Sequence, residues 1–152
     1  MVLPWSAQQL IAELDQVFVR AGAQADLQVQ SDYAKYLVIR VSGLVEQVAT
    51  EIVLTHVSAQ ASPTVTAHVA WRMGTFQNPN IERLLQLVGS FDRRWNEELN
   101  DAITDAERGA LGSITAQRNR VAHGQPSTVS LSQVAQYYAE AKSVLTKLAD
   151  VL

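Results

Sequence analysis

Arg118, Asn119 and His123 have types and a spacing that suit chemistry, and Gly124 follows them directly. Histidine normally titrates near pH 7, so His123 could take or give a proton. The guanidinium of Arg118 stays charged and offers a planar pair of donors to phosphate oxygens. Asn119 precedes His123 by four residues, about one helical turn, and could orient the imidazole or bind the same ligand. The group therefore suits proton transfer on an anionic substrate.

One helix is expected to carry these residues. Thr104 and Glu107 stand three apart in the pattern of a capping box, which marks the start of a helix. The helix should end at His123, because Gly124 suits the position just past a helix end and Pro126 cannot continue one. The sequence thus predicts that the chemistry lies on the last turns of a helix.

The two arginines of this segment should face different surroundings. At 100° per residue, Arg118 falls in the middle of the apolar face, whereas Arg120 falls on a polar face. A guanidinium that points inward needs an anionic partner or a water-filled cleft. Around an unbroken helix, Arg118 and His123 would lie about 140° apart. Either the helix end frees His123 to swing toward Arg118, or a second subunit supplies the partner residue.

Residues with little side-chain bulk recur on the opposite side of the same helix. They are Gly109, Gly112 and Ala116, followed by Asn119 and His123 in the last turns. Glycine inside a helix costs about 1 kcal/mol relative to alanine, so a compensation in packing or function is expected. A symmetry-related helix or a ligand could approach closely along this stripe.

Helical periodicity also recurs along the rest of the chain. Further helices are expected from Ser6 to Gly22, Ser31 to Val57, Ser62 to Phe76, Ile81 to Val88, Asp92 to Ile103 and Ser130 to the C-terminus. Cap signals support several of these starts, above all Ser62 before Pro63, and Ser130 with Gln133. No repeat or linker divides the chain. We therefore expect one domain over residues 1–152, an all-α bundle of about five to six helices.

Composition excludes several classes of protein. The 152 residues include no cysteine, which rules out disulfides and thiolate metal sites. Three scattered histidines form no compact ligand set, so we expect no metal and no other cofactor. No stretch approaches the roughly 18 apolar residues of a membrane helix, and no signal peptide is expected, which favours the cytoplasm and no membrane partner. With a net charge of −3, any contact with nucleic acid must be local.

The segment from Arg118 to Gly124, read Arg-Asn-Arg-Val-Ala-His-Gly, resembles the Arg-x4-6-His signature of the HEPN superfamily. It has the form with Asn directly after Arg, and the chain looks most similar to the RiboL-PSP-HEPN group. The resemblance covers roughly residues 36 to 148. Within that range the stretch from Phe76 to Leu85, the region of Trp95, the motif, and the stretch from Val129 to Tyr138 follow in the order typical of the group.

The resemblance implies a helical bundle that dimerises through its motif helices. It also implies metal-independent endoribonuclease activity in many members, and frequent placement in toxin–antitoxin, abortive-infection or other defence systems. On this basis Arg118 and His123 match the catalytic pair, and Asn119 matches the polar position between them.

Three further residues are candidates for supporting roles. No catalytic acid is matched by the resemblance, but Arg40 and Glu46 lie on the expected long helix. Glu46 is the expected counter-ion of an inward-pointing Arg118, and Arg40 is a second companion. Arg120, on the polar face, would make a phosphate contact that contributes only to affinity.

The leading hypothesis is an endoribonuclease that acts as a homodimer with both motifs in one cleft. RNA would be its substrate, and an antitoxin or other neutralising protein a further partner. The alternative is a non-catalytic helical module whose cleft binds RNA, a nucleotide or a protein, which the negative net charge fits somewhat better. A third interpretation is a purely structural bundle.

Other polar and aromatic residues have simpler interpretations. His56 and His68 are expected on the surface or at caps, since neither has a partner at metal-ligand spacing. The stretch from Asp92 to Trp95 could stack on RNA bases, but a charged, mostly exposed helix with one inward tryptophan explains it as well. Trp71 with Arg72 has the same two interpretations. Tyr137 and Tyr138 are expected to pack the last helix into the bundle.

Overall fold

The computed structural model describes residues 2–152, in which seven α-helices and no strand occur. The helices are α1 (Trp5–Gly22), α2 (Leu27–Gln60), α3 (Pro63–Met73), α4 (Ile81–Gly89), α5 (Arg93–Ala102), α6 (Asp105–Ala122) and α7 (Leu131–Val151). The all-α prediction is confirmed. The count exceeds the expected five to six, because each of the helical segments expected from the periodicity, the short α3, α4 and α5 included, forms a helix of its own. Asn80 caps the start of α4, and Asp92 caps the start of α5.

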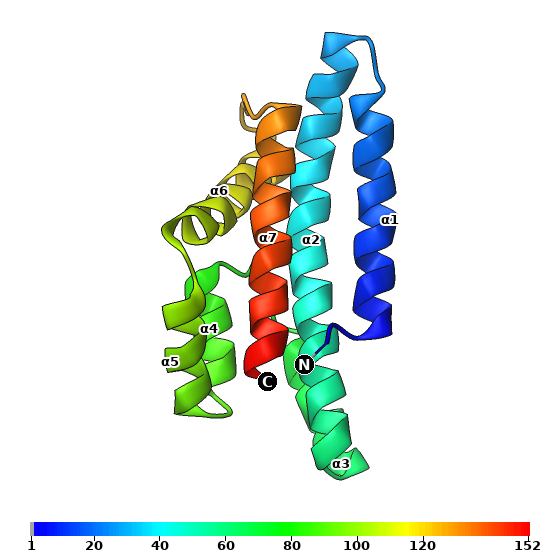
Figure 1. The fold of residues 1–152 in the computed structure, drawn as a ribbon. Helices are drawn as coiled ribbons and strands as arrows, with labels where there is room; N and C mark the ends of the chain where they lie inside the picture. The colour runs from blue at the N-terminus through cyan, green and yellow to red at the C-terminus, as the bar shows by residue number, and fades with distance from the viewer. Residues whose placement is uncertain (1) are drawn as a thin grey trace.

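Three long helices, α1, α2 and α7, stand side by side in Figure 1. Helix α6 lies across the upper half of the bundle and packs against both α2 and α7. Helices α4 and α5 form a pair below α6, and α3 lies at the lower end of α2. The last turn of α6 and the lower helices are therefore well separated along the long axis of the molecule.

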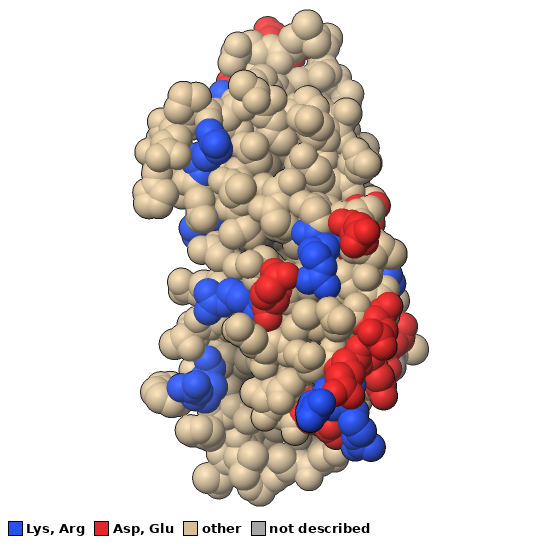
Figure 2. Space-filling model, turned by 90° about the vertical axis from the view of Figure 1, so that its left-hand side faces the viewer, with Lys and Arg blue, Asp and Glu red and all other residues tan. Residues whose placement is uncertain are grey.

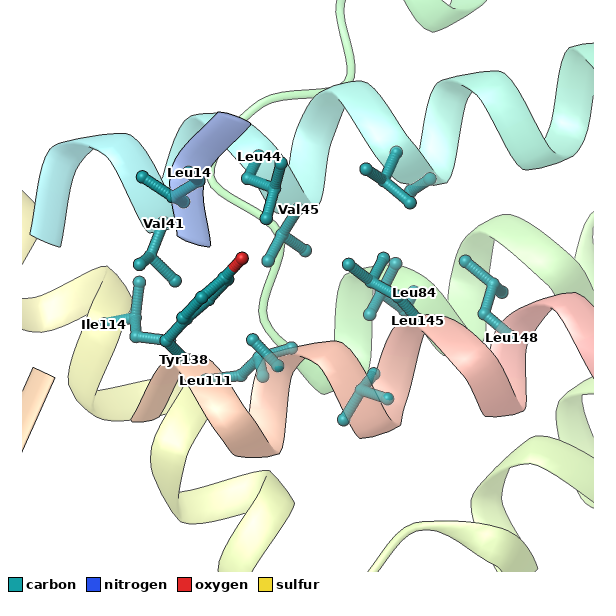
Figure 3. Packing of buried hydrophobic residues seen from close by; sticks show 14 of the residues in the cluster. Leu14, Val41, Leu44, Val45, Leu84, Leu111, Ile114, Tyr138, Leu145 and Leu148 are labelled. Atoms are coloured by element: carbon teal, nitrogen blue, oxygen red, sulfur yellow. The ribbon is translucent and has the colours of Figure 1, made fainter. Parts of the chain in front are cut away.

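Helix α2 is the central element of the core, with twelve buried residues along its length. Figure 3 shows how Val41, Leu44 and Val45 from this helix meet apolar side chains of the helices around it. The partners labelled there are Leu14 of α1, Leu84 of α4, Leu111 and Ile114 of α6, and Tyr138, Leu145 and Leu148 of α7. Burial of this apolar surface is the main force that holds α6 in place.

The predicted helix starts are confirmed at three places. Thr104 with Glu107, and Ser130 with Gln133, form complete capping boxes. Ser62 accepts a hydrogen bond from the backbone of Val65, and Pro63 takes the first helical position as predicted. These caps satisfy backbone N–H groups that would otherwise lack partners at a helix start.

Two predicted starts are wrong. Helix α1 begins at Trp5 without a side-chain cap, and the Ser6 hydroxyl instead donates to Glu51 Oε2 of α2 at 2.7 Å. Helix α2 begins at Leu27, four residues before Ser31, because Asp26 accepts hydrogen bonds from two backbone N–H groups of its first turn. At α2 the aspartate thus supplies the cap in place of Ser31, whereas at α1 the contact with Glu51 engages the Ser6 hydroxyl and the helix start has no side-chain cap.

A buried ion pair fixes the start of α6 on α7. Glu107 is 2% exposed, and its carboxylate accepts hydrogen bonds from Ser143 Oγ at 2.6 Å, from Lys147 Nζ at 2.6 and 2.7 Å, and from the backbone of Thr104 at 2.7 Å. Burial raises the pKa of this carboxyl, but the hydrogen bonds from Lys147, Ser143 and Thr104 outweigh it and lower the pKa to about 2. The helix that carries the motif is thereby anchored at its first turn.

None of the helices found between residues 2 and 152 combines the length and apolar character needed to span a membrane.

Candidate active site

The motif lies at a helix end of defined geometry. Helix α6 runs to Ala122, His123 is its C-terminal cap residue, and Gly124 adopts a positive φ of 65°. The backbone N–H of Gly124 donates to Val121 at 3.1 Å, and that of Gln125 donates to Arg120 at 2.8 Å. This pair of bonds is the Schellman motif, which favours glycine at the left-handed position. The predicted end of the helix at His123 is confirmed.

The loop after the motif is also tied back to the helix. Ser127 Oγ donates to Gln117 Oε1 at 2.9 Å, which joins the connection to the polar face of α6. Nothing in the sequence pointed to this pair, because a serine and a glutamine ten residues apart carry no local signal. Together with the Schellman bonds, it leaves the backbone around His123 little freedom.

Arg118 is half-buried at the point where the core face of α6 comes to an end. Ala110, Leu111 and Ile114 are buried, whereas Val121 is only partly covered. The Nη1 atom of Arg118 donates to Asn119 Oδ1 at 3.3 Å. Among the described residues no carboxylate forms an ion pair with this guanidinium. The expectation of a core-facing arginine with an anionic partner is therefore wrong, because the core ends one turn earlier.

Glu46 and Arg40 do not support the motif as expected. Glu46 Oε1 accepts a hydrogen bond from the backbone N–H of Asn78 at 2.6 Å, so it braces the loop before α4 rather than neutralising Arg118. Arg40 Nη1 donates to the hydroxyl of Tyr36 at 2.6 Å and lines a hollow between α1 and α2. Both residues lie on the predicted long helix, but Glu46 is bound by the distant Asn78, and Arg40 is bound by Tyr36 one turn away on the same helix.

His123 and Arg120 are exposed, as the helical wheel predicts for Arg120. The backbone N–H of His123 still donates to the carbonyl of Asn119 at 3.1 Å, so the helical path continues up to the cap. No hydrogen bond between the side chains of Arg118 and His123 occurs in residues 2–152. The regular helix keeps the two residues about 140° apart around its axis, and the route in which the helix end frees His123 is not observed.

The stripe of small residues on α6 is uncovered. Gly109, Gly112, Ala116, Asn119 and His123 are all exposed. A Cβ atom added at Gly109 or Gly112 would meet nothing within 4 Å. Figure 2 shows the side of the molecule where α6, α4 and α5 lie, and its charged side chains gather mainly in the lower half. The stripe itself carries little side-chain bulk and, before His123, only uncharged residues.

Metal ligands are not gathered at the motif. Within the described part of the chain, no three His, Asp or Glu side chains lie close enough to hold a metal ion. His56 packs edge-on against Trp95 at 5.1 Å, and its ring pairs with Gln60 at 3.0 Å. His68 tilts against Trp71 at 5.7 Å. Both histidines outside the motif thus lie against tryptophan rings.

The tyrosine pair near the start of α7 divides between core and surface. Tyr138 is buried, stacks on Phe18 at 4.6 Å and donates to the carbonyl of Ile11 at 3.1 Å, which confirms its packing role. Tyr137 is partly buried and packs at the edge of the same core. The observed contacts of the pair are thus packing contacts.

Comparison with known proteins identifies a family model that matches the chain. The family model described as RiboL-PSP-HEPN matches residues 5–152, nearly the whole chain. Neither the curated proteins nor the solved structures yielded a significant match.

Proposed function

We propose that this chain, which belongs to the RiboL-PSP-HEPN family, is a metal-independent endoribonuclease that acts as a homodimer. The observation that carries the proposal is the arrangement at the end of α6. Within residues 2–152 the positively charged Arg118 has no carboxylate partner, Asn119 contacts it, and His123 is exposed at a fixed helix cap. The proposal treats residues 1–152 as one domain.

The chemistry needs no metal ion. The 2′-hydroxyl of RNA attacks the adjacent phosphorus, the new O2′–P bond forms, and the bond from phosphorus to the 5′-oxygen breaks. The products carry a 2′,3′-cyclic phosphate and a 5′-hydroxyl. A group with a pKa near neutrality must move protons, which is the role of His123. A fixed cation must stabilise the charge of the crowded phosphorane, which is the role of Arg118.

Two subunits would complete the site. Within one chain Arg118 and His123 leave α6 in different directions, so a single copy does not aim both at one phosphate. The uncovered stripe that contains Gly109, Gly112 and Asn119 allows a second α6 to approach closely about a two-fold axis. The partner helix would then bring a second set of motif residues into the same cleft.

The cellular setting proposed is that of a toxin or defence effector in the cytoplasm. An unrestrained ribonuclease is harmful to its host, so a neutralising protein or antitoxin would be its partner. Expression should arrest growth with the wild-type chain and not with His123→Ala. Growth arrest by both proteins would contradict a role that depends on RNA cleavage.

Cleavage of end-labelled RNA by the purified protein tests the enzyme directly. The wild-type protein should cleave RNA over many turnovers, and its products should carry cyclic phosphate ends. His123→Ala should be inactive, whereas His56→Gln, which changes a histidine outside the motif, should stay active. Retained RNA binding with no turnover in the wild type would favour the alternative, a non-catalytic binding module, which the net charge of −3 also fits. Variants that affect only stability would favour a structural bundle.

A further inference from the structure

A second hollow lies between α3 and α4, away from the motif. Its volume is about 530 Å³, and residues from the end of α3 and from one face of α4 line it. We call this hollow the groove. In Figure 1 these helices lie in the lower half of the molecule, whereas α6 ends in the upper half. The groove is therefore separate from the candidate active site, and nothing in the proposed cleavage chemistry uses it.

The groove has a local positive charge in an acidic chain. Arg72 of α3 and Arg83 of α4 line it from opposite sides, and both are exposed. Neither guanidinium has a hydrogen bond or ion pair within the described residues. No aspartate or glutamate is among the lining residues. The neighbouring carboxylate of Glu82 is engaged by Arg108 at 2.7 Å. Two unpartnered cations that face one hollow favour an anionic ligand.

Aromatic surface accompanies the charge. Phe91 lines the groove and is 41% exposed, although its ring lies at a tilt beside that of Trp95, with ring centroids 6.3 Å apart. Trp71, beside Arg72 on α3 but not itself a lining residue, is 69% exposed, and its ring lies next to that of His68. Leaving large aromatic side chains in water costs free energy, so exposed rings beside a groove favour a surface that a ligand covers. Cations with exposed rings are the combination that holds unpaired nucleotides, by phosphate contact and base stacking.

We propose that the groove between α3 and α4 binds single-stranded RNA, with phosphates at Arg72 and Arg83 and a base on Phe91. The choice of RNA rests on the proposed function, since a ribonuclease must hold a strand on both sides of the cut. An acidic protein segment would satisfy the two arginines but would leave the aromatic rings without a partner. The groove is thus a strand-holding site remote from the cleaved bond.

Binding of a fluorescent 2′-O-methyl RNA 12-mer to the full chain tests this inference. The blocked 2′-oxygens cannot attack phosphorus, so binding is measured without cleavage. Arg72→Ala with Arg83→Ala should weaken binding at least about tenfold at low salt, and should reduce the slope of log affinity against log salt by about 1.4, the value for two phosphate contacts on a single strand. The matched control, Arg20→Ala with Arg93→Ala, removes the same charge from exposed positions outside the groove. It should change affinity less than twofold.

The aromatic contact has its own signature. Phe91→Leu keeps an apolar side chain against Trp95 but removes the flat surface for a base. It should weaken binding about fivefold with the salt slope unchanged, because stacking releases no counterions. A poly-glutamate peptide of the same charge should bind at least ten times more weakly than the RNA. Circular dichroism spectra should match those of the wild type for every variant.

The outcomes separate this inference from the proposed function. The groove proposal would be wrong if the wild type did not bind the 12-mer. It would also be wrong if the groove double variant and the control double variant bound the RNA with equal affinity. Poly-glutamate binding as tight as RNA and indifferent to Phe91→Leu would replace it with a site for an acidic protein. If the chain fails to cleave RNA but the groove variants weaken binding as expected, the nuclease is wrong and the groove stands. If the chain cleaves RNA and the groove variants bind it as tightly as the wild type, the nuclease stands and the groove proposal is wrong.

Discussion

The side-chain oxygen of Asn119 accepts a hydrogen bond from Arg118 Nη1 at 3.3 Å. The backbone carbonyl of the same asparagine accepts a hydrogen bond from the backbone N–H of His123 at 3.1 Å. Asn119 thus contacts both of its motif partners, although its amide faces the arginine rather than the imidazole that the sequence suggested. Because the acceptor is a neutral amide, it orients the Arg118 guanidinium without neutralising its positive charge.

Replacing this amide by a carboxylate should be more harmful than removing it. Asn119→Asp has almost the same shape, but its charge would hold the guanidinium and repel a substrate phosphate. We expect a loss of cleavage of about a hundredfold for Asn119→Asp and about tenfold for Asn119→Ala. Single-turnover rates at saturating protein measure both. The same loss in the two variants would show that the charge of Arg118 is not what Asn119 protects.

Cleavage should survive removal of divalent metal ions. The described residues hold no cluster of potential ligands, and the proposed chemistry relies on Arg118 and His123 alone. The rate in excess EDTA should therefore equal the rate in untreated buffer within about twofold. Restoration of a lost activity by Mg²⁺ or Mn²⁺ would contradict the mechanism, because the cation that stabilises the phosphorane would then be the metal.

The uncovered stripe on α6 should be a dimer interface. Gly112→Ala adds a methyl group that meets nothing within 4 Å in the chain and gains about 1 kcal/mol of helix propensity. Gly112→Leu adds a side chain that would separate two close helices. Light scattering at micromolar concentration should give twice the monomer mass for the wild type and a lower average mass for Gly112→Leu. A wild type that is strictly monomeric would remove the shared cleft.

The thermal stability of the same variants serves as the control. Gly112→Ala and Gly112→Leu should both unfold no earlier than the wild type at a concentration where every protein is monomeric, since the position is exposed. A loss of association without a loss of stability then assigns the effect to the interface rather than to the fold.

The sequence predicts most helices because their signals are local. Capping boxes at Thr104 and Ser130, and the glycine at position 124, depend on residues within one turn, and all three are confirmed. The starts of α1 and α2 were wrong because serine is only one way to satisfy a helix start. Asp26 takes that role for α2, and Ser6 is drawn to Glu51, 45 residues away.

The candidate site shows the same division. The position of Arg118, Asn119 and His123 on one helix end follows from spacing alone. The partner of Glu46 does not, since Asn78 lies 32 residues away and reaches it only through the fold. The pair of Arg40 with Tyr36 is local, at a spacing of four residues on one helix, and was missed although the sequence carries that signal. A helical wheel gives the direction of Arg118 but not the point where the neighbouring helices stop covering it. The two arginines that line the groove between α3 and α4 likewise come from helices that share no local pattern.

The ion pair between Glu107 and Lys147 should make the fold sensitive to acid. The pKa of Glu107 is lowered from 4.5 to about 2 in the folded chain. A carboxyl with a depressed folded pKa stabilises the protein above its unfolded pKa, and this stability is lost as the pH falls through the folded value. The shift corresponds to about 3 kcal/mol, lost between about pH 4.5 and pH 2. Urea unfolding at a series of pH values measures it.

Substitution separates this carboxyl from the other acidic groups. Glu107→Gln leaves Lys147 without its anion, should cost about 3 kcal/mol at pH 7 and should flatten the loss of stability below pH 4.5. Glu97→Gln, which removes an exposed partner of Arg93, should cost less than about 1 kcal/mol and leave the acid profile unchanged. An unchanged acid profile in Glu107→Gln would show that other carboxyls govern acid unfolding.

The two arginines of the motif should differ in kind, although both lie within five residues of His123. Arg118 is half-buried and held by Asn119, whereas Arg120 is exposed and has no side-chain partner in the described residues. Arg118→Ala should lower the cleavage rate at least about a hundredfold, the scale for loss of a donor to a transition-state charge. Arg120→Ala should lower only the affinity for RNA, and less so at high salt, because it removes one phosphate contact.

Arg118→Lys decides whether charge or geometry matters at this position. An ammonium keeps the charge but cannot present two parallel donors to phosphate oxygens, so cleavage should fail as in Arg118→Ala. Single-turnover rates at saturating protein separate the rate from affinity, and circular dichroism checks the fold of each variant. Equal losses for Arg118→Ala and Arg120→Ala would mean that the motif acts as an undifferentiated basic patch. Full activity in Arg118→Lys would reduce the role of Arg118 to a point charge, since only the forked geometry distinguishes the two side chains there.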